Sequence, residues 1–255
     1  MRFSVLTLFP EMFCGFLEAS MVKRGLERGL FAVDLVQIRD FAPEPHRQVD
    51  DAPFGGGPGM VMKVDCLARA LDAVVTPQTE VVYLTPQGLP FTQESAAELS
   101  NLEHVVLLCG HYEGIDERIV ASRVDREYSS GDVVLTGGEL PAMMIVDAVS
   151  RLLPGVLGDP ESAACDSFQH GLLDHPHYTR PASWSDGRGG KVEEVPEVLR
   201  SGDHGRIAAW RRRQALLRTL IRRPDLLGQA RLTRHEQRLL EALRRELDAE
   251  EPLDR

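Results

Sequence analysis

The sequence predicts an α/β protein with a mostly parallel sheet, followed by a smaller helical part. Two observations lead to this prediction. Short apolar segments of strand length alternate with helix-like segments over residues 1–152, and a second helical stretch fills the chain after about residue 196. Strands that alternate with helices favour a parallel sheet covered on both faces. A chain of 255 residues is long enough for one large and one smaller domain.

The predicted strands are short runs of β-branched or apolar residues bounded by turn residues. They are Phe3–Leu8, Val33–Ile38, Val81–Thr85 and Val105–Cys109. Apolar residues at helical spacing predict the helices between these strands. They are Met21–Arg28, Val64–Val74, Thr92–Ser100 and a helix that begins near Glu139 and runs through Ala148 to Leu152.

From Pro154 to about Pro196 neither periodicity persists, because Pro, Gly, Asp, Ser and His dominate. We expect a connector with inserted loops there, and its stretch Ser183–Lys191 is typical of an exposed, flexible loop. The chain is then helical to its end. Thr233 and Glu236 have the spacing of a capping box and predict the start of the last helix.

The composition limits the class of protein. No run approaches the roughly 18 apolar residues of a membrane helix, and Pro10 and Glu11 interrupt the first apolar run too early for a signal peptide. We therefore expect a cytosolic protein without a membrane partner. Four widely separated cysteines predict reduced, mostly buried thiols, not disulfides or a cysteine zinc site. These are Cys14, Cys66, Cys109 and Cys165.

Four glycine-rich turns point to a shared pocket. They lie at 54–60, 83–88, 109–118 and 131–141. Ligands of parallel sheets bind beyond the carboxyl ends of the strands, and glycine allows a backbone to approach a ligand closely. One such turn could be ordinary chain reversal, whereas four at one edge favour a ligand site. A P-loop and a G-x-G-x-x-G turn after the first strand are both missing from the sequence, which argues against the common nucleotide-binding families.

Several long and unusual strings strongly resemble the bacterial tRNA (guanine-N1)-methyltransferases, members of the trefoil-knotted SPOUT class. In chain order they lie at 8–13, 47–51, 55–60, 109–118, 131–141, 150–158, 166–168 and 171–181. The resemblance implies a knotted α/β domain that binds S-adenosylmethionine at 1–160, a connector at 161–181 and a helical tRNA-binding domain at 182–255. Knotted chains are very rare, so the knot follows from the resemblance alone.

The resemblance also implies which residues hold S-adenosylmethionine. They are Tyr83, Leu84, Thr85, Pro86, Gly110, Tyr112, Glu113, Gly114, Ser130, Gly131, Asp132, Val133, Val134, Leu135, Gly137, Gly138 and Pro141. Among them, Glu113 or Asp132 could bind the ribose hydroxyls or offset the sulfonium charge. Core packing at the end of a strand is the alternative for Tyr112.

Methylation of guanine N1 requires a general base for the N1 proton and a cation or donor for the charge that develops on O6. The resemblance implies Asp166 as the base and Arg151 as the group at O6. From the residues alone, Asp166 could equally be a helix N-cap, and Arg151 could stabilise a helix C-terminus. The chain differs from relatives at Cys165, where they often carry an acidic residue, and at His111, where they carry arginine.

The resemblance implies that tRNA contacts come from three places. They are the glycine turn (Gly55, Gly56, Gly59), the connector (His177, Tyr178, Arg180) and the arginine-rich segment (Arg211, Arg218, Arg222). It also implies magnesium as an aid to methyl transfer, without a dedicated protein cage, since oxygen ligands such as Asp166 would suit it. A cluster in the connector has the character of a metal site, although a polar loop is the interpretation we favour. Its members are His170, Asp174, His175 and His177.

Residues 204–224 contain seven arginines and no acidic residue, although the whole chain carries a net charge of −10. A helical wheel predicts that Ile207, Trp210, Leu217, Leu220 and Ile221 form a buried face beside a stripe of three arginines. Such a helix suits the tracking of phosphates, and a merely solvated arginine face is the alternative.

Two other functions remain open from the residues. One is a metal-dependent hydrolase that uses the His/Asp cluster, and the other is a non-catalytic RNA-binding adaptor. The resemblance instead implies a homodimer, in which the 110–138 loops of one subunit and Asp166 of the other share each active site.

Overall fold

The computed structural model describes residues 1–158, 166–168, 171–185, 187, 191–228 and 230–250. The chain forms two compact units, Met1–Ala163 and Ala164–Arg255, and each is described by itself.

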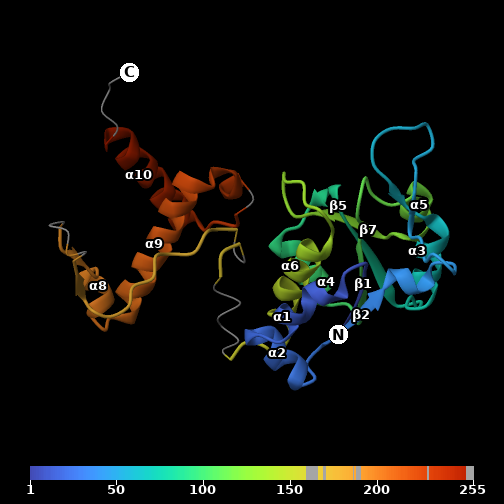
Figure 1. The fold of residues 1–255 in the computed structure, drawn as a ribbon. Coiled ribbons are helices and arrows are strands. Elements are labelled where there is room, and N and C mark those ends of the chain that lie inside the picture. The colour runs from blue at the N-terminus through green and yellow to red at the C-terminus, as the bar shows by residue number, and fades with distance from the viewer. Residues whose placement is uncertain (159–165, 169–170, 186, 188–190, 229, 251–255) are drawn as a thin grey trace. The chain divides into compact units, whose positions relative to one another are not determined.

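The first unit is built on a five-stranded sheet with the order β2-β1-β6-β5-β7 (Figure 1). All neighbouring strands are parallel. The strands are β1 (Arg2–Thr7), β2 (Ala32–Gln37), β5 (Thr79–Pro90), β6 (His104–Cys109) and β7 (Arg126–Ser129). The predicted α/β class with a mostly parallel sheet is therefore confirmed, and so are the four predicted strands.

Helices cover both faces of this sheet (Figure 1). One face packs against α2 (Ser20–Glu27), α4 (Gln93–Leu99) and α6 (Glu139–Ser150), and the other against α3 (Val64–Asp72) and α5 (Glu117–Arg123). Strand β6 is apolar after His104 because both of its faces are buried. Val105 and Leu107 belong to one core and Val106 and Leu108 to the other, because successive side chains of a strand point to opposite faces.

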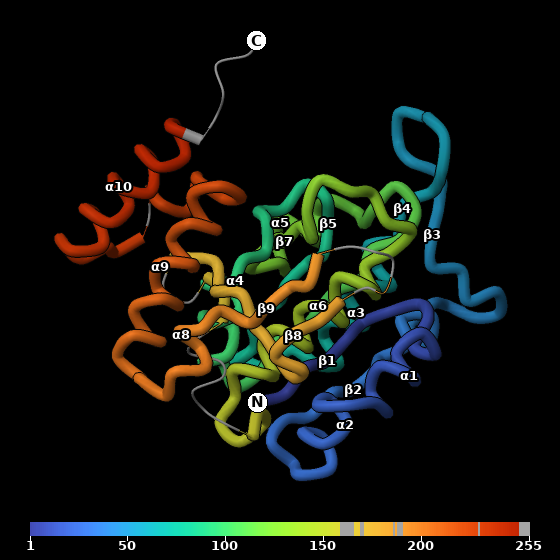
Figure 2. Tube along the Cα trace, turned by 90° about the vertical axis from the view of Figure 1, so that its left-hand side faces the viewer, coloured from blue at the N-terminus to red at the C-terminus, as the bar shows by residue number. Residues whose placement is uncertain are grey.

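Shorter elements complete the first unit. These are η1 (Pro10–Phe13), α1 (Cys14–Leu17), η2 (Ile38–Phe41) and the antiparallel pair β3 (Asp50–Asp51) and β4 (Val61–Met62). The loop between β3 and β4 extends away from the sheet in both Figure 1 and Figure 2. It contains a predicted glycine turn, in which Gly55, Gly56, Gly57 and Gly59 all have positive φ. Only glycine adopts such a run without strain.

The second unit contains α8 (Glu197–Arg200), α9 (His204–Arg222), η3 (Pro224–Gly228) and α10 (Arg234–Glu250). Leu216 of α9 and Leu243 of α10 are fully buried in its core, together with Leu172. The predicted capping box of α10 is present. Thr233 N–H donates to Glu236 Oε2 at 2.7 Å, and Glu236 N–H donates to Thr233 Oγ1 at 3.3 Å. Among the described residues, no helix is both long and apolar enough to cross a bilayer.

The structure corrects the sequence prediction in the connector. Ser183–Trp184 (β8) pairs with Glu193–Glu194 (β9) in an antiparallel ladder, as Figure 2 shows, where only loop was expected. Trp184 and its neighbours are exposed, as predicted for this stretch. Residues 186 and 188–190 of the predicted flexible loop lie outside the described residues.

The predicted buried face of the arginine-rich helix is right for Leu217 and Leu220, which pack against the core of the second unit, but wrong for Ile221. The residues of α9 that are buried are Ala215, Leu216 and Thr219, whereas Ile221 is 58% exposed. Thr219 can be buried because its hydroxyl donates to Ala215 O at 2.7 Å and accepts from Leu173 N–H at 2.9 Å. The helix therefore presents a face that a count of apolar residues does not identify.

Candidate functional site

A hollow lies at the carboxyl edge of the sheet, bordered by residues 83–87 within β5 and by the chain at and after the ends of β6 and β7. It is lined by Tyr83, Leu84, Thr85, Pro86, Gln87, Gly110, His111, Tyr112, Glu113, Gly114, Tyr128, Ser129, Ser130, Val133, Val134, Leu135, Thr136, Gly137, Gly138 and Pro141. The structure thus brings together the residues predicted to hold the cofactor, except Gly131 and Asp132. For all of these residues, the role in cofactor binding stays a prediction.

Gly131 and Asp132 are kept off the hollow by a tight turn. Ser129 Oγ accepts from Gly131 N–H at 3.1 Å and donates to Gly131 O at 3.0 Å. Gly131 has a φ of +126°. The turn carries these two residues out of the lining before the chain returns with Val133.

Two glycines permit the close approach of the loops that form the hollow. Gly138 N–H donates to Gly110 O at 3.0 Å, and a Cβ on Gly138 would lie 2.7 Å from the Cα of Cys109. A Cβ on Gly110 would lie 2.9 Å from the Tyr83 hydroxyl. A side chain at Gly138 would force the chain before α6 away from the end of β6, and one at Gly110 would displace the Tyr83 ring.

Tyr112 is not a core residue. Its side chain lines the hollow and is 51% exposed, and its φ is +61°. The alternative of core packing at the strand end is therefore wrong. A positive φ at a non-glycine residue is uncommon, and such strained residues cluster at active sites and ligand-binding sites.

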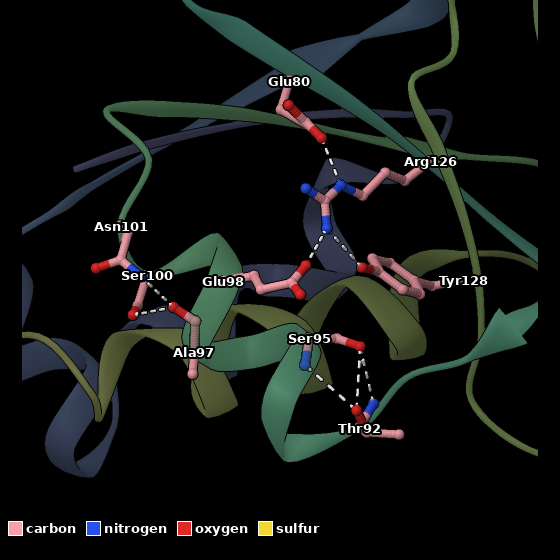
Figure 3. A network of polar contacts seen from close by, with 9 residues as sticks. All are labelled: Glu80, Thr92, Ser95, Ala97, Glu98, Ser100, Asn101, Arg126 and Tyr128. Carbon is pink, nitrogen blue, oxygen red and sulfur yellow. Dashed lines mark hydrogen bonds and ion pairs between the residues drawn. The ribbon is translucent and has the colours of Figure 1, made fainter.

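Tyr128, which the sequence prediction missed, forms part of the hollow and is held from behind by Arg126 (Figure 3). Arg126 Nη1 donates to the Tyr128 hydroxyl at 3.2 Å and to Glu98, and its Nε donates to Glu80 at 2.5 Å. The hydrogen bonds to Tyr128, Glu98 and Glu80 raise the pKa of Arg126. Phe91 meets the Tyr128 ring edge-on at 5.4 Å. Strands β5 and β7 and helix α4 are thereby joined behind the hollow.

A buried carboxylate contacts His111 and lies against Gly137, two residues that line the hollow. Glu139, the first residue of α6, is 1% exposed. Its Oε1 accepts from Thr7 Oγ1 at 2.6 Å, and both its oxygens lie 2.8 Å from His111 Nε2. Burial acts to raise the pKa of Glu139, but the hydrogen bonds from His111 and Thr7 outweigh it and leave that pKa below its ordinary value.

The glycine turn between β3 and β4 reaches the hollow at one point. Gly59 lies directly against the Glu113 side chain, where a Cβ would overlap the carboxylate. Glu113 N–H donates to Met60 O at 3.0 Å. Around Gly55 and Gly56 no atom lies within 4 Å of an added Cβ, so this end of the turn is open.

The two predicted catalytic residues lie in different units. Arg151 is the C-cap of α6 in the first unit, and its N–H donates to Asp147 O at 3.2 Å. That position agrees with the alternative role at a helix C-terminus. Asp166 lies in the second unit and lines a separate hollow. Its other lining residues are Leu172, Leu173, Asp174, His175, His204, Ile207, Ala208, Arg211, Arg212 and Ala215.

The connector cluster is closed by internal hydrogen bonds. Asp174 Oδ1 lies 2.5 Å from His175 Nδ1, and Asp174 Oδ2 lies 2.8 Å from His177 Nε2. Burial acts to raise the pKa of Asp174, but these hydrogen bonds outweigh it and lower that pKa. The three side chains have potential ligand atoms within 4.8 Å of one another, yet the carboxylate already binds both imidazoles. His170, the fourth predicted member, lies outside the described residues.

The arginines of α9 divide into two groups. Arg212 pairs with Glu236 and Arg213 with Glu246, both on α10. Within the described ranges, the other four, Arg206, Arg211, Arg218 and Arg222, take part in no ion pair. Arg211, Arg218 and Arg222 are the three that the sequence predicts to contact tRNA. Nearby, the rings of Tyr178 and Trp210 lie 6.2 Å apart.

The family model and three relatives that match this chain all carry the name of one kind of tRNA methyltransferase. The family model described as tRNA (Guanine-1)-methyltransferase TrmD matches residues 1–229. A tRNA (guanine-N(1)-)-methyltransferase of Magnetococcus marinus is 64% identical over 250 residues, which cover 98% of each chain. The enzyme of the same name from Moorella thermoacetica is 54% identical over 249 residues, covering 96% of this chain and 97% of its own. That of Pelotomaculum thermopropionicum is 54% identical over 247 residues, covering 95% and 96%.

Proposed function

The chain belongs to the tRNA (guanine-1)-methyltransferase family, and on this basis we propose that it methylates N1 of the guanosine on the 3′ side of the anticodon. The methyl donor is S-adenosylmethionine, bound in the hollow at the carboxyl edge of the sheet, and the reaction takes place in the cytosol. The observation that carries this proposal is the convergence of the three predicted loops on one hollow in a chain with such close relatives. The hydrolase and adaptor interpretations gain no support from these relatives.

The residues of the hollow fit S-adenosylmethionine. Val133 and Val134 line it with exposed fractions of 56% and 88%, so a bound adenosine would cover apolar surface that otherwise faces water. Main-chain groups of the glycine loops can bind the adenine edge and ribose, and the Glu113 carboxylate suits a positively charged ligand. When bound, S-adenosylmethionine supplies an electrophilic methyl group on a sulfonium.

The protein's part in the reaction is proton transfer and charge stabilisation. Asp166 would accept the N1 proton, and the electron pair of the broken N–H bond would form the new bond from N1 to the methyl carbon. The methyl–sulfur bond would break at the same time, with its electron pair left on the sulfur of the departing S-adenosylhomocysteine. Arg151 stabilises the negative charge that develops on O6. A positioned base contributes about 10²–10⁴ in rate. We include magnesium as an aid held by Asp166 and substrate oxygens, because a carboxylate suits this ion.

The proposal includes a deep knot around residues 130–138. In its support, β5 passes a register shift between Leu84 and Leu89, after which Leu89 pairs with Tyr128. Gly138, at the far end of the loop, is hydrogen-bonded to Gly110. Both observations support the proposal, because they bring the chain that leads into α6 against the residues that follow β6.

Binding of tRNA is assigned to the helical part, residues 182–255, and chiefly to Arg211, Arg218 and Arg222. The other predicted contacts are the glycine turn at Gly55–Gly59 and His177, Tyr178 and Arg180 of the connector. The carrying observation is the absence of ion pairs at the three α9 arginines among the described residues.

The first experiment maps methylated nucleosides by mass spectrometry after incubation of unmodified tRNA transcripts with labelled S-adenosylmethionine. Methylation is expected at the guanosine 3′ of the anticodon and should disappear when that base is adenosine. Asp166→Ala should abolish turnover and leave the dissociation constant for S-adenosylmethionine unchanged in calorimetry. Asp147→Ala, on a helix surface, is the matched control. Loss of cofactor binding by Asp166→Ala would show that Asp166 is structural.

The second experiment tests the proposed homodimer. If Asp166 acts on the hollow of the partner subunit, then Asp166→Ala and Gly138→Trp subunits should regain activity when mixed, because one site of the mixed dimer is intact. Each variant alone should be inactive. An inactive mixture in which tagged subunits have exchanged would mean that each chain supplies its own base.

A further inference from the structure

Glu139 joins three segments that are far apart in the sequence. Its partner Thr7 is the last residue of β1, His111 follows β6, and Glu139 itself begins α6. Thr7 is further fixed because its Oγ1 accepts from Phe9 N–H at 2.9 Å. A buried carboxylate without partners is strongly unfavourable, so these segments are held in one arrangement.

The His111 side chain is also closely packed. Its side chain is 12% exposed, and its ring lies 4.9 Å from that of Phe9. The ring also occupies the space in which a Cβ of Gly137 would lie. The backbones of His111 and Gly137 form an antiparallel bridge. His111 therefore contacts the second bordering loop of the hollow through both its backbone and its side chain.

We propose that His111 is a positioning residue for cofactor binding, which ties the 110–114 loop to the 133–138 loop through Glu139. These two loops supply much of the lining of the hollow, including Tyr112 and Val134. Without the tie, the loops can separate, and the main-chain groups that would bind S-adenosylmethionine lose their spacing. The inference rests on the proposed function, because it assumes that this hollow is the cofactor site.

A second buried histidine provides a matched control. His104 lies at the opposite end of β6 and is also buried, with Nε2 2.9 Å from Ser4 Oγ and Nδ1 2.9 Å from Thr79 Oγ1. Its loss should destabilise the sheet in much the same way, but at the amino end of the strands and away from the hollow. If His111 had a purely structural role, replacing either histidine would lower the melting temperature and leave the affinity for the cofactor unchanged.

The experiment compares His111→Ala, His111→Gln and His104→Ala by titration calorimetry with S-adenosylmethionine and by thermal unfolding. His111→Ala should weaken cofactor binding by about tenfold or more, because a bond to a buried charge is lost. His111→Gln, whose amide nitrogen can replace Nε2, should bind within about threefold of the natural chain. His104→Ala should lower the melting temperature and leave the dissociation constant unchanged.

Equal cofactor affinity of His111→Ala and His104→Ala would overturn the inference. If His111→Ala does not fold, Glu139→Gln replaces it, since it keeps the volume and removes the charge. It too should weaken cofactor binding, and unchanged affinity would refute the tie. The proposed function is tested separately by the natural chain and by Val134→Asp. Lack of cofactor binding by the former, or unaffected binding by the latter, would show that the hollow is not the cofactor site.

Discussion

Replacement of Gly138 by alanine tests whether the close approach of the two loops holds the hollow together. The added Cβ would lie 2.7 Å from Cys109 Cα and 3.2 Å from Gly110 N, both backbone atoms that cannot rotate away. An ordinary contact requires a separation of about 3.4–4 Å, so the chain must move by about 1 Å, which also lengthens the Gly138–Gly110 hydrogen bond. Overpacking of this kind destabilises by about 1–3 kcal/mol. For a unit of this size the melting temperature should fall by roughly 2–12 °C.

The assay is differential scanning calorimetry with and without S-adenosylmethionine, beside Gly15→Ala as the matched control. Gly15 lies in α1, has no atom within 4 Å of an added Cβ, and does not have a positive φ. Alanine there should be neutral or stabilise by up to about 1 kcal/mol. If Gly138→Ala and Gly15→Ala have the same melting temperature and the same affinity for the cofactor, the argument from close approach is refuted.

Three further predictions concern charges and the last helix. Arg218→Ala should weaken tRNA binding and reduce the slope of log K against log salt concentration by about 0.9. Arg213 is paired with Glu246, so Arg213→Ala should change neither the affinity nor the slope. Equal slopes for the two variants would contradict the assignment. Glu139 has a pKa below its ordinary 4.5 in the folded protein, so its stabilisation is complete above that pH and is lost as pH falls through the folded pKa. As the pH is lowered from above 4.5, the free energy of unfolding should therefore depend less on pH in Glu139→Gln than in the natural chain, and an unaltered dependence would exclude this origin. Thr233→Ala should destabilise α10 by about 0.5–2 kcal/mol, seen as faster amide exchange in its first turn, and unchanged exchange would argue against the cap.

The sequence predicts the interior of the sheet well and its margin poorly. Strand β6 consists of buried apolar residues after His104, so its apolar run is unmistakable. Strand β7 was missed because Arg126 and Glu127 give it a polar start, and only contacts with β5 and α4 make an arginine suitable there. Helix α5 was missed for a related reason. Ile119 is its one fully buried side chain, which is too little for a periodic pattern.

Sequence motifs predict most of the site residues, but they miss those whose position depends on contacts between distant segments. Gly138 and Gly110 stand in recognisable motifs, and the structure brings them within a hydrogen bond of each other. Tyr128 could not be found in this way, because its position depends on β7 and on Arg126. The resemblance predicts Asp132 as a cofactor contact because it belongs to the 130–138 loop, but it does not line the hollow in the structure.

Both margins of the sheet carry charged side chains that discourage further growth. Strand β2 is one outer strand, and its Asp34 pairs with Arg2 at 2.5 Å. Strand β7 is the other outer strand, and Arg126 places a cation there between two acidic residues. An outer strand has unpaired peptide groups to which a strand of another molecule could add, and buried or crowded charges make that addition unfavourable. The ion pairs of Arg126 behind the hollow thus also place charge on an outer strand, where charged side chains disfavour the addition of a further strand.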